Sequence, residues 1–195
     1  MTPIRQILTI AAMIVSMALL APLSTTAAEK AIDTQNTLFL DTIHGRTVIK
    51  LRPDLAPNHV KRIKKLTREG FYDGLKFHRV INGFMAQTGD PKGNGTGGSQ
   101  LPDLKAEFSP RPFEKGVVGM ARSANPNSAN SQFFIMFDSA SWLNGQYTVW
   151  GEVTSGMEFI DKVKKGEPPV KPDTIVKMQI AADAAASGAK AIRKK

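Results

Sequence analysis

Residues 77–90 read FHRVINGFMAQTGD, a strand-like run that holds polar side chains a strand core rarely contains. Val, Ile and Phe favour β-strands, yet Arg79 lies among them, and arginine is almost never buried without a partner. Gln87 follows closely after an aromatic residue and a thioether, Phe84 and Met85. The stretch has no cysteine, carboxylate pair or serine triad. The remaining candidate for a functional group is the Arg79 guanidinium, which would act beside an apolar surface.

The first 28 residues have the pattern of a secretory signal peptide. Arg5 precedes an apolar run of about 14 residues, 7–20, and a stretch of small residues follows as far as Ala28. The alternative is an uncleaved inner-membrane anchor, but the run is short for a span of about 20 residues. We therefore expect a signal peptide over 1–28, an N-terminal leader over 29–36 and a periplasmic protein with no stable membrane association after cleavage.

Composition excludes several kinds of site. The chain has 195 residues, which suits one domain once its ends are removed, and it contains no cysteine. Disulfides, zinc–thiolate centres and thiol nucleophiles are therefore absent. The three histidines, His44, His59 and His78, do not have metal-ligand spacing. We expect no metal and no cofactor.

The chain is basic, with a net charge of +9, or +8 after loss of residues 1–28 and their one arginine. The densest basic run, 61–68, reads KRIKKLTR. Val60, Ile63 and Leu66 recur there at helical spacing, so the charges form the outer face of an amphipathic helix. The charge permits weak attraction to anionic surfaces, but it predicts no specific nucleic-acid partner.

Turn signals divide the chain into many short strands and few helices. A hairpin is predicted over 37–51 around His44 and Gly45, and a helix from Pro57 to Arg68 that Gly70 ends. Further strands are predicted over 75–81, 84–88, 116–121, 132–137, 147–153 and 174–180.

A second helix is predicted after the strand at 147–153. Ser155 and Glu158 have the spacing of a capping box, and Met157, Ile160 and Val163 form an apolar stripe. Residues 181–195 form a low-complexity basic tail to which no element is assigned. These boundaries leave one domain, 37–180.

Residues 93–98, GNGTGG, match the letters of a dinucleotide-binding motif. That motif requires a helix to open directly after the glycines, and Pro102 makes such a helix improbable. The stretch is therefore predicted to be a loop with many turns.

Two later stretches complete a longer pattern: GMARSANPNSANSQFFIMF over 119–137 and SWLNGQYTVWGEV over 141–153. Together with 77–90 and 93–98, they strongly resemble the cyclophilin family of peptidyl-prolyl cis–trans isomerases, over residues 36–180. The resemblance implies a mainly β fold, an eight-stranded antiparallel closed β-barrel capped by two α-helices, with its active site on the outer surface.

The resemblance also implies roles for single residues. Arg79 matches the family's catalytic arginine. Phe84 and Met85 match the walls of a proline pocket, Phe134 its floor, and Trp142 its rim. The full set of expected substrate-binding residues is Phe84, Met85, Gln87, Ala121, Arg122, Gln132, Phe134, Trp142, Leu143 and Tyr147.

This sequence departs from the family pattern in two places. The segment 122–130 is one residue longer than in the familiar eukaryotic members, which affects the position of Arg122. Tyr147 stands where many members have histidine. A tryptophan at the position of Trp142 can donate its indole N–H to cyclosporin in the family, so the resemblance implies binding of this drug.

The expected activity needs little chemistry. Rotation about an X–Pro bond breaks no covalent bond, so it requires no nucleophile, general base or metal. The expected partners are proline-containing polypeptides that are unfolded or folding. Without the family motif around them, these residues would have ordinary structural roles: the core for Phe134, Met85 and Leu143, and a structural ion pair for Arg79.

The alternative function is a proline-binding or holdase chaperone module in which turnover is incidental.

Overall fold

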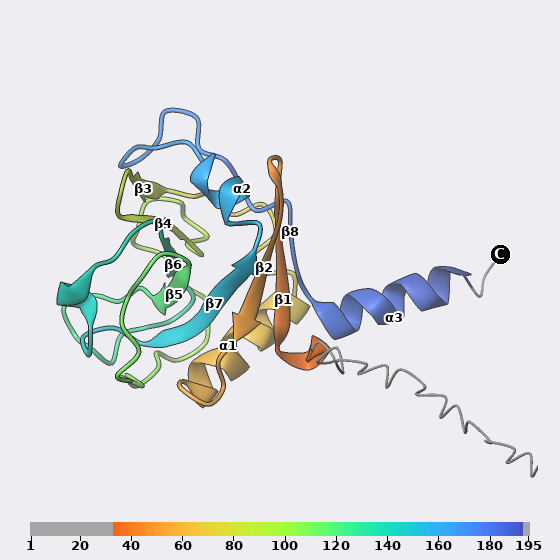
Figure 1. Ribbon diagram of the computed structural model, residues 1–195, viewed down its shortest axis with the longest axis horizontal. Coiled ribbons are helices and arrows are strands. Elements are labelled where there is room, and N and C mark those ends of the chain that lie inside the picture. The colour runs from red at the N-terminus through yellow and green to blue at the C-terminus, as the bar shows by residue number, and fades with distance from the viewer. Residues whose placement is uncertain (1–32, 193–195) are drawn as a thin grey trace, which may run out of the picture. The chain divides into compact units, whose positions relative to one another are not determined.

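The computed structural model describes residues 33–192, which fold around one antiparallel sheet of eight strands (Figure 1). The strands follow one another across the sheet in the order β3-β4-β6-β5-β7-β2-β1-β8. Their bounds are β1 Thr37–Thr42, β2 Gly45–Leu51, β3 Arg79–Ile81, β4 Met85–Thr88, β5 Val117–Met120, β6 Phe133–Met136, β7 Val149–Ser155 and β8 Lys177–Ile180.

The strands agree closely with the sequence pattern. Four of the predicted strands are confirmed with ends that differ by one or two residues, as β4, β5, β6 and β7. Only the last part of 75–81 and of 174–180 is strand, as β3 and β8. The predicted hairpin is β1–β2, and because Thr42 pairs with Gly45, its turn is Ile43 and His44, one residue earlier than expected.

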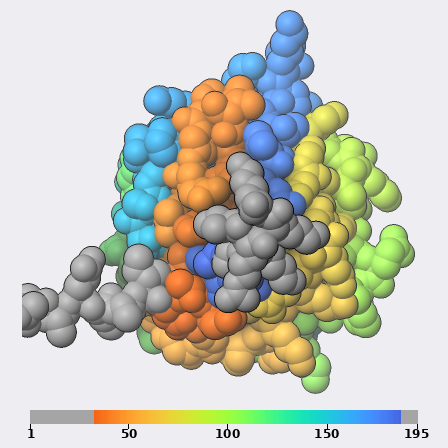
Figure 2. Space-filling view, turned by 90° about the vertical axis from the view of Figure 1, so that its right-hand side faces the viewer, coloured from red at the N-terminus to blue at the C-terminus, as the bar shows by residue number. Residues whose placement is uncertain are grey.

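Helix α1, Pro57–Arg68, has the predicted bounds. Proline at the first helical position needs no hydrogen-bond acceptor, and Gly70 after the helix has a φ of +70° that glycine adopts readily. Val60, Ile63 and Leu66 are buried, and Lys61, Lys65 and Arg68 are exposed as expected. Arg62 departs from the expected outer face, because it is buried and donates to the carbonyl oxygens of Pro102 and Asn130. In Figure 2 the hairpin β1–β2 lies beside β8, its ladder partner through β1.

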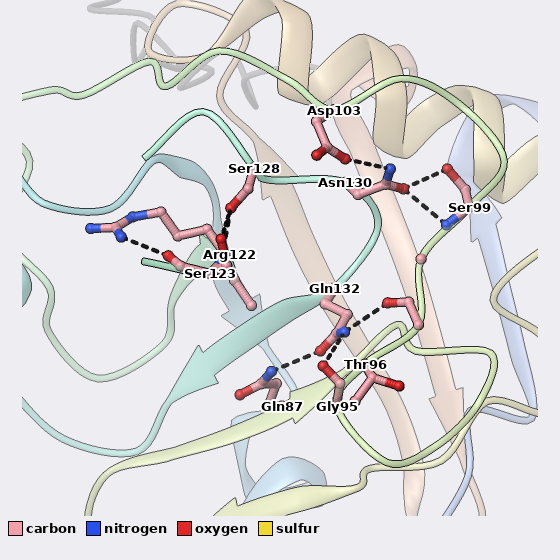
Figure 3. A pocket seen from close by; sticks show the side chains of 13 residues that line it. Gln87, Gly95, Thr96, Ser99, Asp103, Arg122, Ser123, Ser128, Asn130 and Gln132 are labelled. Atoms are coloured by element: carbon pink, nitrogen blue, oxygen red, sulfur yellow. Dashed lines mark hydrogen bonds between the residues drawn. The ribbon is translucent and has the colours of Figure 1, made fainter. Parts of the chain in front are cut away.

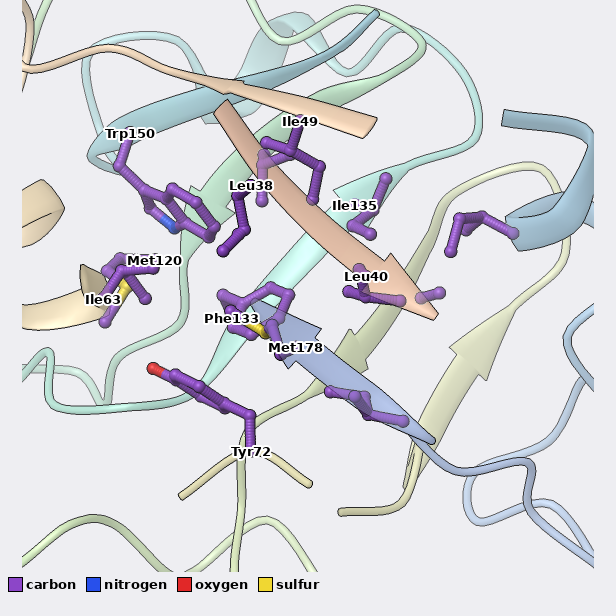
Figure 4. Packing of buried hydrophobic residues seen from close by; sticks show 14 of the residues in the cluster. Leu38, Leu40, Ile49, Ile63, Tyr72, Met120, Phe133, Ile135, Trp150 and Met178 are labelled. Carbon is purple, nitrogen blue, oxygen red and sulfur yellow. The ribbon is translucent and has the colours of Figure 1, made fainter. Parts of the chain in front are cut away.

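The main core fills one face of the sheet. Trp150 and Tyr72 both contact the ring of Phe133 edge to face, at centroid distances of 5.3 and 5.5 Å. Figure 4 shows Leu38, Leu40, Ile49, Ile63, Met120, Ile135 and Met178 gathered around these rings. A second, smaller apolar cluster lies apart from the main core and includes Phe134, Met136 and Met85.

The sheet is an open half-barrel, so the expectation of a closed barrel was wrong. Its edge strands β3 and β8 do not pair with each other. Isolated bridges between Lys76 and Thr174 and between Val80 and Gly166, with backbone hydrogen bonds around them, are the contacts between the edge at β3 and the segment that precedes β8. Residues 168, 169 and 172 are prolines, which have no N–H to donate to a ladder.

The expectation of two α-helices was also wrong, since residues 33–192 contain three. Helix α2, Met157–Asp161, is short, and α3, Ala181–Ile192, occupies most of the tail that was assigned no element. Alanine has the highest helix propensity, which explains why this alanine-rich stretch is helical. The Arg68 guanidinium donates from Nε to Oδ2 of Asp183 over 2.8 Å, which ties the start of α3 to α1.

The predicted capping box before α2 does not form. Ser155 is the last residue of β7 and pairs with Val48, so its backbone is extended. Gly156 is the N-cap instead, with a φ of +78°, and no side chain caps the helix. A Cβ at Gly156 would lie 2.3 Å from the carbonyl oxygen of Arg46, so only glycine fits between β7 and β2.

The remaining elements are two 3₁₀ turns, η1 Thr34–Asn36 and η2 Ser141–Leu143. Within residues 33–192, no helix combines the length and apolarity needed to cross a bilayer. The predicted signal peptide, 1–28, lies outside the described residues.

Candidate functional site

A surface pocket of about 330 Å³ gathers most of the residues that the sequence singled out. Its lining consists of Arg79, Phe84, Met85, Gln87, Ala121, Arg122, Phe134, Trp142, Leu143 and Tyr147. All ten are among the eleven residues expected at the site. The remaining one, Gln132, lies in an adjoining hollow.

Three neighbouring strands build the floor of the pocket. Phe134 on β6 is opposite Gln87 on β4 and Gly119 on β5. A Cβ on Gly119 would lie 2.6 Å from the rings of both Phe113 and Phe134. The absence of a side chain at this position therefore allows the two rings to stack, with their centroids 5.7 Å apart.

The walls of the pocket consist of aromatic and apolar side chains. Trp142, on η2, is 67% exposed, and its ring centroid is 5.9 Å from that of Phe84. Leu143 beside it is buried. The Tyr147 ring stands nearly perpendicular to Phe134 at 5.8 Å, and the Arg122 guanidinium carbon lies 4.4 Å from the Tyr147 centroid. The result is an apolar hollow that is open to solvent on one side.

Arg79 supplies a positive charge at this apolar hollow. It is the first residue of β3 and lies opposite Gln87 on β4. Its side chain is 42% exposed, and its Nε donates a hydrogen bond to Oε2 of Glu167 over 2.8 Å. The sequence contains no sign of this partner, because Glu167 lies 88 residues away from Arg79 along the chain.

A second, polar hollow of about 510 Å³ adjoins the first and shares Gln87, Ala121 and Arg122 with it. Figure 3 shows Gln132 at the junction. Its Nε2 donates to the carbonyl oxygens of Gly95 and Gly97, over 3.0 and 2.8 Å. Its Oε1 accepts a 2.9 Å hydrogen bond from Gln87 Nε2. Gln132 therefore links the pocket to the GNGTGG segment.

The GNGTGG segment is a loop, as predicted, and a buried carboxylate holds it. Asp90 accepts hydrogen bonds from the backbone N–H groups of Lys92, Asn94 and Gly95. Burial raises the pKa of Asp90, but these hydrogen bonds outweigh burial and leave the pKa below its usual value. A Cβ at Gly97 would lie 2.0 Å from Oδ1 of Asp90, so the loop needs glycine there.

His78 precedes Arg79 but lines neither hollow. Successive side chains of an extended chain point to opposite faces, and His78 is buried while Arg79 is half exposed. Burial lowers the pKa of the His78 imidazole, and the nearby Asp90 carboxylate opposes this. The neutral ring is therefore part of the packing behind the site.

Comparison with known protein families places the whole sheet in one family. The family model for cyclophilin type peptidyl-prolyl cis-trans isomerase/CLD matches residues 37–180. A probable peptidyl-prolyl cis-trans isomerase of Brucella suis is 60% identical over an alignment of 169 residues that covers 78% of this chain and 86% of the relative. Peptidyl-prolyl cis-trans isomerase B of Bacillus subtilis is 45% identical over 119 residues, covering 60% of this chain and 82% of that protein.

Two solved structures have a similar fold. A cyclophilin from Hirschia baltica matches with a TM-score of 0.73 and 31% identity, covering 78% of this chain and 76% of its own. A cyclophilin type peptidyl-prolyl cis-trans isomerase from Cryptosporidium parvum, crystallised in the presence of the dipeptide Ala-Pro, has a TM-score of 0.69 and 29% identity. That match covers 74% of this chain and 98% of the other.

The buried histidines predict how stability depends on pH. Burial lowers the pKa of both His78 and His59, although for His59 a 2.6 Å hydrogen bond to Glu107 opposes the shift. In the unfolded chain histidine titrates near pH 6.5, so below about that pH the unfolded state binds protons first. The contribution of the two histidines to the free energy of unfolding should therefore be fully present above about pH 6.5 and decrease as the pH falls below it.

Urea denaturation at intervals from pH 7.5 to 5.0 measures this dependence. Each of His59→Gln and His78→Gln should remove part of the slope, and the double variant should remove most of it. Against the opposing effect of burial, backbone hydrogen bonds hold the pKa of the Asp90 carboxyl below its usual value, so its contribution to stability is lost only in a more acidic range. An unchanged slope in the double variant would show that the two buried rings are not its cause.

Proposed function

Because this chain belongs to the cyclophilin family of peptidyl-prolyl cis–trans isomerases, we propose that it accelerates rotation about X–Pro bonds with the Arg79 cation beside an apolar proline pocket. One observation carries the proposal. The half-exposed guanidinium of Arg79 and the side chains of Phe84, Met85 and Phe134 line a single pocket. A cation and an apolar shelf in contact are the two components that this rotation needs.

The reaction is difficult because amide resonance must be lost. The barrier to rotation is about 18–20 kcal/mol, and uncatalysed X–Pro exchange takes on the order of tens to hundreds of seconds. As the bond twists, the prolyl nitrogen becomes pyramidal and more basic. A hydrogen bond from Arg79 to that nitrogen, or to the redistributed amide charge, stabilises the twisted form more than the planar form.

The cation alone is not sufficient. A hydrogen bond that involves a charged group contributes about 1.5–3 kcal/mol. At about 1.36 kcal/mol for each factor of ten, that corresponds to roughly ten- to a hundredfold in rate. The remaining acceleration comes from the pocket, where Phe134, Met85 and Leu143 hold the proline ring while the preceding peptide group turns.

The substrates that fit this site are proline-containing polypeptides, unfolded or folding. The pocket is apolar where the ring would lie and open to solvent, so the chain on either side of the proline can extend along the surface. The Ala-Pro dipeptide named for the Cryptosporidium relative supports this substrate class. The adjoining polar hollow at Gln132 offers carbonyl and amide groups next to the pocket.

The first prediction from the proposed function concerns Arg79. Arg79→Ala should lower kcat/KM about ten- to a hundredfold in a protease-coupled assay with a proline peptide. Its thermal transition should stay near that of the wild type, because exposed ion pairs contribute little to stability. Arg46→Ala is the matched control, since Arg46 is 50% exposed and pairs with Asp41 away from the pocket.

Unchanged turnover in Arg79→Ala would contradict the proposed mechanism. Suppression of client aggregation, measured on the same variant, tests the alternative function. A holdase with incidental turnover would need no cation, so a full chaperone effect on aggregating clients without Arg79 would favour that reading.

The second prediction concerns cyclosporin, which we propose binds at the same pocket. Trp142 is exposed at the rim, where its indole can meet a ligand. Trp142→Phe removes one donor and should weaken binding by about threefold to tenfold in titration calorimetry. The melting temperature of the variant should not change, because Trp142 buries little surface. Equal affinities in the two proteins would show that the Trp142 indole N–H does not bind the drug.

The third prediction concerns export. We propose that residues 1–28 direct the chain to the periplasm and are cleaved, on the basis of Arg5, the apolar run 7–20 and the small residues that follow. Mass spectrometry of the protein made in a Gram-negative host should give an N-terminus near Glu29. An intact Met1 on a membrane-bound product would support the inner-membrane anchor instead.

A further inference from the structure

The ion pair of Arg79 with Glu167 lies at the edge of the pocket. Oε2 of Glu167 accepts from Nε of Arg79 over 2.8 Å, and the two side chains are 42% and 51% exposed. Pairs as exposed as this one contribute little to the free energy of unfolding. A contribution to stability therefore does not explain why this ion pair is present.

The backbone sets Glu167 opposite Arg79. Val80 and Gly166 exchange two hydrogen bonds, each 2.8 Å long, in an isolated antiparallel bridge. One residue before Val80 and one residue after Gly166 are then directly opposite each other, which is the position of Arg79 and Glu167. Directly opposite pairs have Cβ atoms about 4.5–5.5 Å apart, close enough for opposite charges to pair.

The segment that carries Glu167 is restrained on both sides. Gly166 has a φ of +147°, and a Cβ there would lie 2.6 Å from Cα of Pro169. Two prolines, 168 and 169, follow Glu167 and fix their own φ angles. Glu167 is also the only acidic residue between Asp161 and Asp173. The restrained turn therefore presents one carboxylate, at one place, to Arg79. Figure 1 shows this segment, between α2 and β8, close to β3.

The pair leaves most of the guanidinium available. Arginine has five N–H donors in one plane, and Glu167 binds only the Nε–H. Within residues 33–192, no hydrogen bond from Nη1 or Nη2 of Arg79 is present. Since the group is planar, a hydrogen bond at Nε restricts rotation of the whole fork while the four Nη protons stay free.

We propose that Glu167 is a positioning residue, which holds Nε of Arg79 so that Nη1 and Nη2 are oriented toward the substrate before it binds. The inference rests on the function proposed above for Arg79. An arginine that is ordered in advance loses less side-chain entropy in the transition state, so removal of Glu167 should lower kcat more than it changes KM.

The experiment compares Glu167→Ala and Glu167→Gln with the wild type and with Arg79→Ala. Glu167→Ala should lower kcat about three- to tenfold and change KM less than about twofold. Glu167→Gln should retain more of the activity, because the amide oxygen can still accept from Nε. Glu69→Ala is the control, since Glu69 is 50% exposed, pairs with Lys65 on α1 and should have no effect.

A second measurement separates positioning from a general structural role. In the NMR spectrum of the substrate-free protein, the Nε–H signal of Arg79 should be sharp and slow to exchange in the wild type. It should exchange faster with water in Glu167→Ala, while the backbone spectrum of the sheet stays the same.

The outcomes are distinct. If Glu167→Ala keeps full activity while Arg79→Ala loses it, the positioning inference is overturned and the proposed function stands. If Glu167→Ala is more active than the wild type, Glu167 competes with the substrate for Arg79, which also overturns positioning. If Arg79→Ala itself keeps full activity, both proposals fail.

Discussion

Strand β6 buries side chains on both of its faces, and the rest of the structure depends on this constraint. Phe133 and Ile135 point into the main core, while Phe134 and Met136 belong to the cluster beneath the pocket. Side chains alternate along a strand, so the register that fills the core also fixes the pocket floor. A slip of one residue would exchange the two sets and destroy both at once. Folding and the candidate site therefore rest on a single register.

The sequence predicted most of the pocket because its residues lie on neighbouring strands with strong local patterns. Arg79, Met85, Gln87 and Phe134 come from β3, β4 and β6, which are adjacent in the sheet. Features that depend on how strands end were predicted less well. Ser155 has the letters of a helix cap, but its ladder pairing with Val48 keeps it extended. The prediction of a closed barrel was wrong for a similar reason. Closure depends on the proline-rich segment before β8, and the local sequence pattern does not predict how that segment pairs.

Contacts between segments that are distant in the sequence set a second limit on what the sequence can predict. The pair of Arg79 and Glu167 follows from a bridge between Val80, in β3, and Gly166, which belongs to no predicted strand. A local window contains neither the bridge nor the charge pair, so no periodicity could have found it. The place of Gln132 likewise depends on carbonyl groups of the loop at Gly95 and Gly97, whose path is set by the buried Asp90. In both cases a loop of irregular backbone decides where a functional side chain lies.

The pocket is a shallow hollow on the surface, with Trp142 standing at its rim. A client polypeptide can bind at such an open pocket from the side, so neither of its termini has to enter first. With the proline site proposed at Phe134, a proline in the middle of a long client, or on a projecting loop of a folded client, reaches that site without any threading of the polymer. Release is equally free of topological hindrance, since the client has no tunnel to leave. An isomerase with this geometry can act late in the maturation of a client as well as on the newly emerged chain.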